Sequence, residues 1–239
     1  MINENEVHIW RSSISVPVDE LQSLKNILAK DEMVRASRFV FEMDCRRYIV
    51  ARALLRKILC FYLPIEADEM IFNYNDYGKP FLPEAINIYN INFNLSHSGS
   101  IIVYAIAKGR EIGIDVERIR EMEACDDIID RYFSFQEKNL FQLISPQLQQ
   151  RSFFTCWTRK EAYVKALGHG LANSFDQFSV SLNPGESPVL LKGDTVDASR
   201  WSIKEVISNS AYVAAVAVKG ENLHYRYYDY FHKDLSDRH

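Results

Sequence analysis

The sequence is short of cysteine, glycine and long apolar runs, and each shortage excludes a class of protein. Its 4 cysteines include no pair at the spacing of zinc ligands and suggest no disulfide framework. With only 9 glycines, it has no Walker loop and no dinucleotide-binding glycine motif. No stretch reaches the ~18 apolar residues of a membrane-spanning helix, and no signal peptide is evident. We therefore expect a cytoplasmic protein with no membrane partner.

Basic charge is not in excess either. The chain carries 28 Lys and Arg against 32 Asp and Glu, a net charge of -4. This balance gives no overall positive field, so we expect no nucleic acid partner. The 239 residues are 47% hydrophobic, which is enough for one large domain or two small ones with a real core.

Each half of the chain is rich in helix first and in strand later. Apolar spacing predicts helices over 18–30 and 42–62. In the second half, Ser134 and Glu137 form a capping box, and a longer helix is predicted from Pro146 to Leu167, with Gly168 as its stop. Strands are predicted at 71–74, 92–96, 101–107, 112–117, 177–182, 189–192, 201–208, 212–218 and 224–230. This order predicts an α+β fold of two closely packed lobes.

Two acids stand side by side on one predicted strand. Asp115 and Glu117 are two residues apart, so their side chains point to one face, roughly 7 Å apart along the strand. Two ionised carboxylates this close repel each other unless a cation lies between them. The pattern is compatible with a hard-cation site and equally with a strand end whose acids face water.

A second group lies on the long helix. Trp157, Glu161 and Lys165 are four residues apart and share one face. Glu161 and Lys165 could form an ordinary surface ion pair. They also have the chemistry of a phosphate–magnesium site, where Glu161 would give a third oxygen ligand and Lys165 would neutralise a phosphate oxygen.

The polar run from Asn94 to Gly99 is a third candidate. Its hydroxyls, its imidazole and its turn amides could hold phosphate oxygens, or simply satisfy a local turn. Ser96 and His97 are adjacent on a strand, so their side chains diverge, and a Ser-His-Asp hydrolase is disfavoured. Lys79 in a Gly-Lys-Pro turn and Arg35 are further candidates, each of which could equally be a plain turn or surface residue.

The order of these motifs resembles the surfactin-type 4′-phosphopantetheinyl transferases. The resemblance rests on FNLSHSG (93–99), GIDVE (113–117), FS-x-x-E (133–137) and W-x-x-KEA-x-x-K-A-x-G-x-GL (157–171). Gly78-Lys79-Pro80 and 178–180 also match. The KEA form is similar to the branch that serves nonribosomal peptide and polyketide synthases, and the length fits the monomeric two-lobed type.

The resemblance implies two similar lobes related by a pseudo-twofold, which we place at 1–108 and 109–239, with coenzyme A in the cleft between them. Asp115, Glu117 and Glu161 match the family's Mg²⁺ ligands. The residues matching coenzyme A contacts are Arg35, Arg47, Lys79, Pro80, Asn94, Leu95, Ser96, His97, Asp115 and Lys165. One departure is Glu32, which stands where some members have a basic residue, so Arg35, Arg38 or Arg47 would divide the contacts to the 3′-phosphate.

The implied reaction moves phosphopantetheine from coenzyme A to a carrier-protein serine and releases 3′,5′-ADP. Lys165 and His97 would stabilise charge on the phosphates, and Glu161 is our candidate base. The carrier protein is expected to dock on 118–143, with Phe133, Leu140 and Phe141 as anchors or, alternatively, as core residues.

Two other functions are compatible with parts of the sequence. The three acids alone would permit another Mg²⁺-dependent phosphoryl enzyme, such as a nucleotide pyrophosphatase. A non-catalytic module that binds coenzyme A or a carrier protein is the other alternative, although it would have no need for the full set of acids and Lys165.

Overall fold

The computed structural model describes residues 2–121, 125–168, 175–193 and 200–230. The helices and strands follow in the order β1 (Glu6–Ser13), α1 (Val18–Lys25), α2 (Lys30–Ala36), α3 (Glu42–Leu59), β2 (Asn73–Tyr74), β3 (Pro80–Phe81), β4 (Ile91–Ser98), β5 (Ile101–Lys108), β6 (Ile112–Arg118), α4 (Cys125–Tyr132), α5 (Phe135–Gln142), α6 (Pro146–Leu167), β7 (Phe178–Val180), β8 (Leu190–Gly193), β9 (Trp201–Ser208), β10 (Tyr212–Lys219) and β11 (His224–Asp229).

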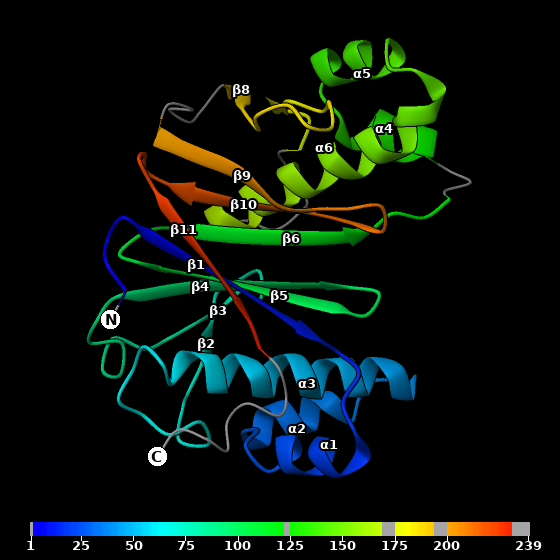
Figure 1. Ribbon diagram of the computed structural model, residues 1–239. Helices are drawn as coiled ribbons and strands as arrows, with labels where there is room; N and C mark the ends of the chain where they lie inside the picture. Colours follow the sequence, from blue (N-terminus) through cyan, green and yellow to red (C-terminus); the bar gives the residue numbers. More distant parts are fainter. Residues whose placement is uncertain (1, 122–124, 169–174, 194–199, 231–239) are drawn as a thin grey trace.

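Two main sheets are stacked between two layers of helices (Figure 1). The first sheet has the strand order β11-β1-β5-β4, and the second has the order β6-β10-β9. Helix α3 covers the outer face of the first sheet, with α1 and α2 packed on the far side of α3, and α6 lies on the outer face of the second sheet (Figure 1). This arrangement confirms a mixed α and β architecture.

Each layer boundary has its own apolar core. Between the sheets, small and β-branched residues of β1 and β5 meet those of β6 and β10, among them Val7, Val103, Ile114 and Val216. The other two cores lie between α3 and the first sheet and between α6 and the second. Side chains alternate across a strand, so the residues of β6 between those that fill the inter-sheet core face α6. That geometry directs the acids of β6 toward the long helix.

Sequence patterns placed most elements correctly. Ser134 accepts a hydrogen bond from the backbone N–H of Glu137 (3.2 Å), while the Glu137 carboxylate accepts one from the N–H of Ser134 (2.8 Å), which confirms the capping box. Helix α6 begins at Pro146 and ends at Leu167, and it is capped by Gly168, whose φ of 72° is left-handed. Strands β4 to β6 and β9 to β11 lie close to their predicted ranges.

The single helix expected over 18–30 is wrong, because the chain forms α1 and α2 with a break at 26–29. The physical reason is Glu32. Its carboxylate accepts a hydrogen bond from the backbone N–H of Ala29 (3.0 Å) and is fixed by two arginines of α3. A second helix therefore starts at Lys30. Helix α4 and strand β3 were also not predicted from the sequence.

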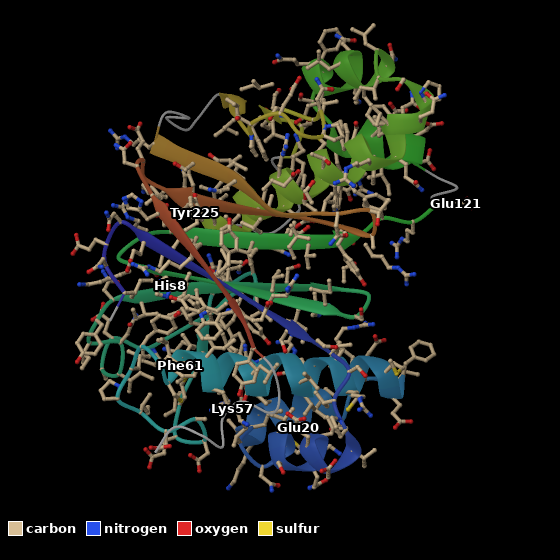
Figure 2. All side chains as sticks on the ribbon, viewed as in Figure 1. His8, Glu20, Lys57, Phe61, Glu121 and Tyr225 are labelled. Atoms are coloured by element: carbon tan, nitrogen blue, oxygen red, sulfur yellow. The ribbon has the colours of Figure 1, made fainter. Side chains whose placement is uncertain are left out.

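The last strand returns to the first sheet. Strand β11 runs parallel to β1, with Glu6 opposite His224 and Arg11 opposite Asp229. Trp10 of β1 stacks against both Phe61 and Tyr228, and Figure 2 shows Phe61 near His8, where the sheet meets the end of α3. Within the described ranges, no helix has the length and apolarity needed to cross a membrane.

Candidate active site

Gly113 sets how closely the acid-bearing strand approaches α6. A Cβ atom on Gly113 would lie 2.1 Å from the carbonyl oxygen of Ala162 and 2.3 Å from the nitrogen of Ala166, so no larger residue fits without moving the helix. Asp115 and Glu117 follow on the same face of β6 as Gly113. The glycine of the GIDVE motif therefore brings the strand's carboxylates next to the helix that carries Glu161 and Lys165.

Asp115 is the centre of the polar cluster. It is buried, and its Oδ1 accepts hydrogen bonds from Lys165 Nζ (2.6 Å) and Ser96 Oγ (2.8 Å). Its other oxygen, Oδ2, is buried and has no hydrogen-bond partner among the described residues. A buried carboxylate oxygen without a partner is costly, because it has lost its water without a replacement. It marks a position suited to a cation or donor that is not part of the protein.

Glu117 and Glu161 complete the acidic group. Burial raises the pKa of Glu161 to about 7, with Lys165 opposing the rise and both Asp115 and Glu117 adding to it. Burial and the charge of Asp115 also raise the pKa of Glu117. The charge of Asp115 thus disfavours the ionisation of both Glu117 and Glu161. In the described parts of the chain, however, no three His, Cys, Asp or Glu side chains form a group ready to hold a metal ion.

Lys165 supplies the opposing charge. Burial lowers its pKa, but the charges of Asp115 and Glu161 outweigh that effect and raise the pKa above its ordinary value. Its side chain is 31% exposed, so the ammonium is reachable from the cavity described below. Lys165 therefore remains a cation that both the acids and an incoming phosphate can contact.

Alternate residues of β4 hold β6 in place. Asn94 accepts a hydrogen bond from the backbone N–H of Ile114 (2.9 Å), Ser96 donates to Asp115, and Ser98 donates to Glu117 (2.9 Å). Ser98 Oγ also accepts from the backbone N–H of Arg118 (3.0 Å). These side chains join the neighbouring edges of the two main sheets. Ser96 and Ser98 orient the two acids. The sequence did not single out Ser98 for this role, although its two-residue spacing from Ser96 was a usable signal.

Leu95 and His97 point the other way along β4 and line a cavity of about 350 Å³. The cavity lies between the first-half helices and α6, and its lining residues are Arg35, Tyr48, Ala51, Arg52, Tyr74, Tyr77, Gly78, Lys79, Pro80, Asn94, Leu95, His97, Glu161, Val164, Lys165 and Gly168. Removal from water lowers the pKa of His97, and the nearby charges of Arg47 and Lys165 lower it further. The predicted residues Arg35, Lys79, Pro80, Asn94, Leu95, His97, Glu161 and Lys165 thus share one cavity.

Arg47, Ser96, Asp115 and Glu117 are not among the residues lining that cavity. Arg47 forms an ion pair with Asp44 (2.7 Å), and its Nε is buried without a hydrogen-bond partner among the described residues. Arg35 lies over the ring of Tyr48, with 5.6 Å from the guanidinium carbon to the ring centroid. The cavity therefore has basic and aromatic groups at its first-half end, and Glu161 and Lys165 at its α6 end.

Several motif residues are structural. Trp157 stacks with Phe175 and Phe153 in the core of the second half and does not line the cavity. Lys160 is fully buried, bonded to Glu137 (2.6 Å) and to the carbonyl of Phe178 (2.8 Å). The shared helix face of Trp157, Glu161 and Lys165 is thus divided between core and cavity.

Glu32, the position that departs from the family pattern, lies away from solvent. It is 1% exposed and pairs with Arg52 (2.6 Å) and Arg56 (2.7 Å). Arg52 also lines the cavity, whereas Arg56 donates to the carbonyls of Ala67 and Met70. Glu32 therefore holds the cavity wall and is not a surface substitute for a phosphate-binding lysine.

Comparisons with known proteins match both halves of the chain. Residues 111–217 match the model of the 4′-phosphopantetheinyl transferase superfamily, and residues 10–109 match the model of the 4′-phosphopantetheinyl transferase N-terminal region. The boundary between the matched segments lies close to Lys108, where the sequence predicted a division between lobes.

Three curated proteins illustrate the similarity. The 4′-phosphopantetheinyl transferase HetI of Nostoc sp. is 38% identical over 216 residues, covering 90% of this chain and 89% of that protein. The 4′-phosphopantetheinyl transferase gsp of Aneurinibacillus migulanus is 32% identical, with 70% and 67% covered. The 4′-phosphopantetheinyl transferase Sfp of Bacillus subtilis is 27% identical, with 69% and 71% covered.

Proposed function

Because this chain belongs to the family of two-domain 4′-phosphopantetheinyl transferases, we propose that it takes the 4′-phosphopantetheine group from coenzyme A and attaches it to a serine of an apo carrier protein. The released product would be 3′,5′-ADP. The observation that carries this proposal is that Glu161 and Lys165 line one end of a cavity whose other end is basic and aromatic, with the buried Asp115 bonded to Lys165. We further propose a cytoplasmic monomer that serves carrier proteins of peptide, polyketide or fatty acid synthesis.

Asp115, Glu117 and Glu161 would hold Mg²⁺. Carboxylate oxygens are the ligands that this hard cation prefers. The fit rests on Asp115, whose buried Oδ2 lacks a partner among the described residues, and on Glu117 and Glu161, whose pKa values are both raised by burial and by the charge of Asp115. Bound Mg²⁺ would offset the negative charge of the pyrophosphate. Ser96 and Ser98 would keep Asp115 and Glu117 turned toward the cation.

Coenzyme A would lie in the cavity with its nucleotide toward the first half of the chain. Arg35 lines that end, and Arg47 lies close enough to His97 to lower its pKa. We propose that Arg35, Arg47 and His97 share the contacts to the 3′-phosphate, since guanidinium groups bind phosphate oxygens well. The backbone at Pro80, Asn94 and Leu95 would border the nucleotide, and Lys165 would reach the pyrophosphate.

In the reaction, the carrier serine oxygen forms a bond to the β-phosphorus of coenzyme A. The bond from that phosphorus to the oxygen bridging to the α-phosphate breaks, and 3′,5′-ADP leaves with this oxygen. The serine proton passes to Glu161, which lines the end of the cavity where Lys165 lies. Lys165 stabilises the negative charge that develops on the phosphate oxygens.

The carrier protein would dock beside α5. Phe133, proposed from the sequence as an anchor, is 1% exposed and belongs to the core, and Phe141 packs edge-on against it. Leu140 is more accessible, and Phe135 and Leu143 are each 82% exposed. We therefore assign the docking surface to Phe135, Leu140 and Leu143. Residues 122–124 of the predicted segment 118–143 lie outside the described residues. Glu121 marks the edge where the chain leaves β6 for α4 (Figure 2).

The decisive experiment is incubation of the purified chain with an apo carrier protein, coenzyme A and Mg²⁺, followed by mass spectrometry of the carrier. We expect a covalent gain of one phosphopantetheine on a serine, and none when that serine is replaced by alanine. Release of phosphopantetheine without carrier labelling would instead indicate a pyrophosphatase. Coenzyme A binding without either product would indicate a binding module.

A further inference from the structure

The turn from Asn75 to Pro80 is bonded to the end of α6, the helix that carries Glu161 and Lys165. The ammonium of Lys79 donates to the backbone carbonyls of Lys165 (2.6 Å), Ile112 (3.0 Å) and Ala166 (3.3 Å). The amide of Asn75 donates to the carbonyl of Gly168 (2.8 Å). A single short turn of the first half thus holds the last turn of α6 and the start of β6 together.

These contacts use all the hydrogen-bonding capacity of the Lys79 side chain. An ammonium has three N–H donors, and three carbonyls accept from this one. The last carbonyls of a helix have no partner within the helix and carry partial negative charge, so a cation there is stabilising. The resemblance implied that Lys79 belongs to a nucleotide-binding segment, but its ammonium has no donor left for a phosphate in this arrangement.

The turn is itself held in one conformation. Asn75 Oδ1 accepts hydrogen bonds from the backbone N–H groups of Tyr77 (3.0 Å) and Lys79 (2.9 Å). On the helix side, Gly168 has a left-handed φ of 72°, and a Cβ on it would lie 3.2 Å from the Asn75 amide nitrogen. Gly168 therefore provides both the end of α6 and the room for the contact with Asn75.

We propose that Lys79 is a positioning residue: it fixes the last turn of α6, so that the Lys165 ammonium is held at Asp115 and at the phosphate end of the cavity. The proposal rests on the proposed transferase function. Its physical basis is that Lys79 binds the backbone carbonyl of Lys165, the same residue whose side chain contacts Asp115. The opposite side of the same turn lines the cavity through Tyr77 to Pro80. Occupation of the cavity and placement of Lys165 would therefore be linked through this turn.

The test compares four forms of the full chain: wild type, Lys79→Met, Lys165→Ala and the double variant. Met keeps most of the length of Lys79 but removes its donors. For each form we would measure kcat and KM for coenzyme A in the carrier assay, the coenzyme A dissociation constant by calorimetry, and the melting temperature. Lys108→Met is the matched control, because the Lys108 side chain forms a surface ion pair with Glu4 (3.9 Å) and does not line the cavity.

We expect Lys79→Met to lower kcat by about tenfold or more, since losing an interaction of about 1.4 kcal/mol changes a rate by that factor. The loss should fall mainly on kcat rather than on coenzyme A affinity. In the Lys165→Ala background the same substitution should have little further effect on kcat, because coupled residues are not additive. Lys108→Met should match the wild type.

The second variant, Gly168→Ala, disturbs the same contact from the helix side and should also lower kcat with Lys79 intact. A folded Lys79→Met protein with wild-type kcat, or losses that add in the double variant, would overturn the positioning role while leaving transfer by the wild type in place. A larger coenzyme A dissociation constant with unchanged kcat would show that Lys79 contacts coenzyme A directly, which would also overturn the positioning role. Wild-type protein that labels no carrier would overturn both proposals.

Discussion

Lys165 Nζ lies 2.6 Å from Asp115 Oδ1, while the buried Oδ2 of the same carboxylate has no hydrogen-bond partner among the described residues. The two oxygens of this carboxylate thus differ in their partners: Oδ1 accepts hydrogen bonds from the protein, and Oδ2 accepts none from the described residues. A carboxylate in this position suits a site that receives a second cation.

The first prediction is an asymmetry between the two partners of this ion pair. Lys165→Met leaves the buried Asp115 without its countercharge, so we expect a loss of about 3 kcal/mol in the free energy of unfolding. Asp115→Asn keeps an oxygen that can accept from Lys165 and relieves repulsion with Glu117 and Glu161, so the loss should be much smaller. Urea unfolding measures both.

Asp115→Asn should nevertheless abolish the Mg²⁺-dependent rise in melting temperature and the transfer activity. Wild-type response to Mg²⁺ in the Asn variant would remove Asp115 from the proposed ligand set. Equal destabilisation by both substitutions would contradict the asymmetry.

The second prediction concerns pH. The pKa of Glu161, raised by burial to about 7 from 4.5, means that the folded protein binds this proton more tightly than the unfolded chain. The stability contributed by Glu161 is therefore fully present below pH 4.5 and is lost as the pH rises through about 7. Because Mg²⁺ binds the ionised carboxylate, it should raise the melting temperature more at pH 8 than at pH 6.

Glu161→Gln should reduce this pH dependence, whereas Glu121→Gln, which changes an exposed acid, should leave it as in the wild type. Calorimetric melting at the two pH values with and without Mg²⁺ checks the prediction. An equal Mg²⁺ effect at both pH values in the wild type would argue against Glu161 as a ligand.

The third prediction tests the close approach of β6 and α6. Gly113→Ala would bring a Cβ against the Ala162 carbonyl, and we expect a loss of roughly 3 kcal/mol in stability, as for severe overpacking. Residual folded protein should have very low activity, because α6 moves away from Asp115. The control is Gly185→Ala. Its added Cβ has no heavy atom within 4 Å, so any loss of stability there comes from backbone strain at the left-handed φ of 83° and not from a clash. A Gly113→Ala protein no less stable than the control would refute the explanation.

The fourth prediction concerns the buried arginine pair. Glu32→Gln removes the charge that compensates Arg52 and Arg56, which are buried together with it. We expect a loss of about 3–5 kcal/mol in stability, the usual result of removing one partner of a buried ion pair. Substitution of Asp31, an exposed neighbour, by Asn is the control. Comparable unfolding curves for the two variants would show that Glu32 is dispensable to the fold.

The fifth prediction concerns carrier docking. Phe135→Ala and Leu143→Ala should each raise the KM for the carrier by roughly fivefold to thirtyfold, the range for truncating an interface anchor. Coenzyme A affinity should not change. Val18→Ala, an equally exposed apolar truncation on α1, should alter neither. Steady-state kinetics with varied carrier concentration measures this KM. An equal KM for the carrier in all three variants would disprove the assignment.

Local periodicity predicted much of this molecule. Two-residue spacing placed Asp115 and Glu117 on one face, and four-residue spacing placed Glu161 and Lys165 on one face of α6. The spacing did not predict that Trp157 packs in the core while Glu161 and Lys165 line the cavity. Which part of a helix face is buried depends on the neighbouring elements. Asn75 and Gly113 act through contacts with distant segments, and single-sequence patterns carry no information on such contacts. The spacing of Ser98 from Ser96 indicated a shared face of β4, but it did not identify Glu117 as the partner of Ser98. The sequence showed Glu32 only as a departure from the family pattern, because the two arginines that allow it to be buried lie 20 and 24 residues along the chain.

The parallel pairing of β1 with β11 has a consequence for biosynthesis. During translation, β1 emerges before β11, so its neighbour on one side is made only when residues 224–229 appear. Until then, one edge of β1 presents unpaired backbone groups that could pair with another chain. We expect shortened chains that end before His224 to aggregate, and ribosome-bound chains of that length to need protection by chaperones. The first half of the enzyme, though made first, would reach its native state last.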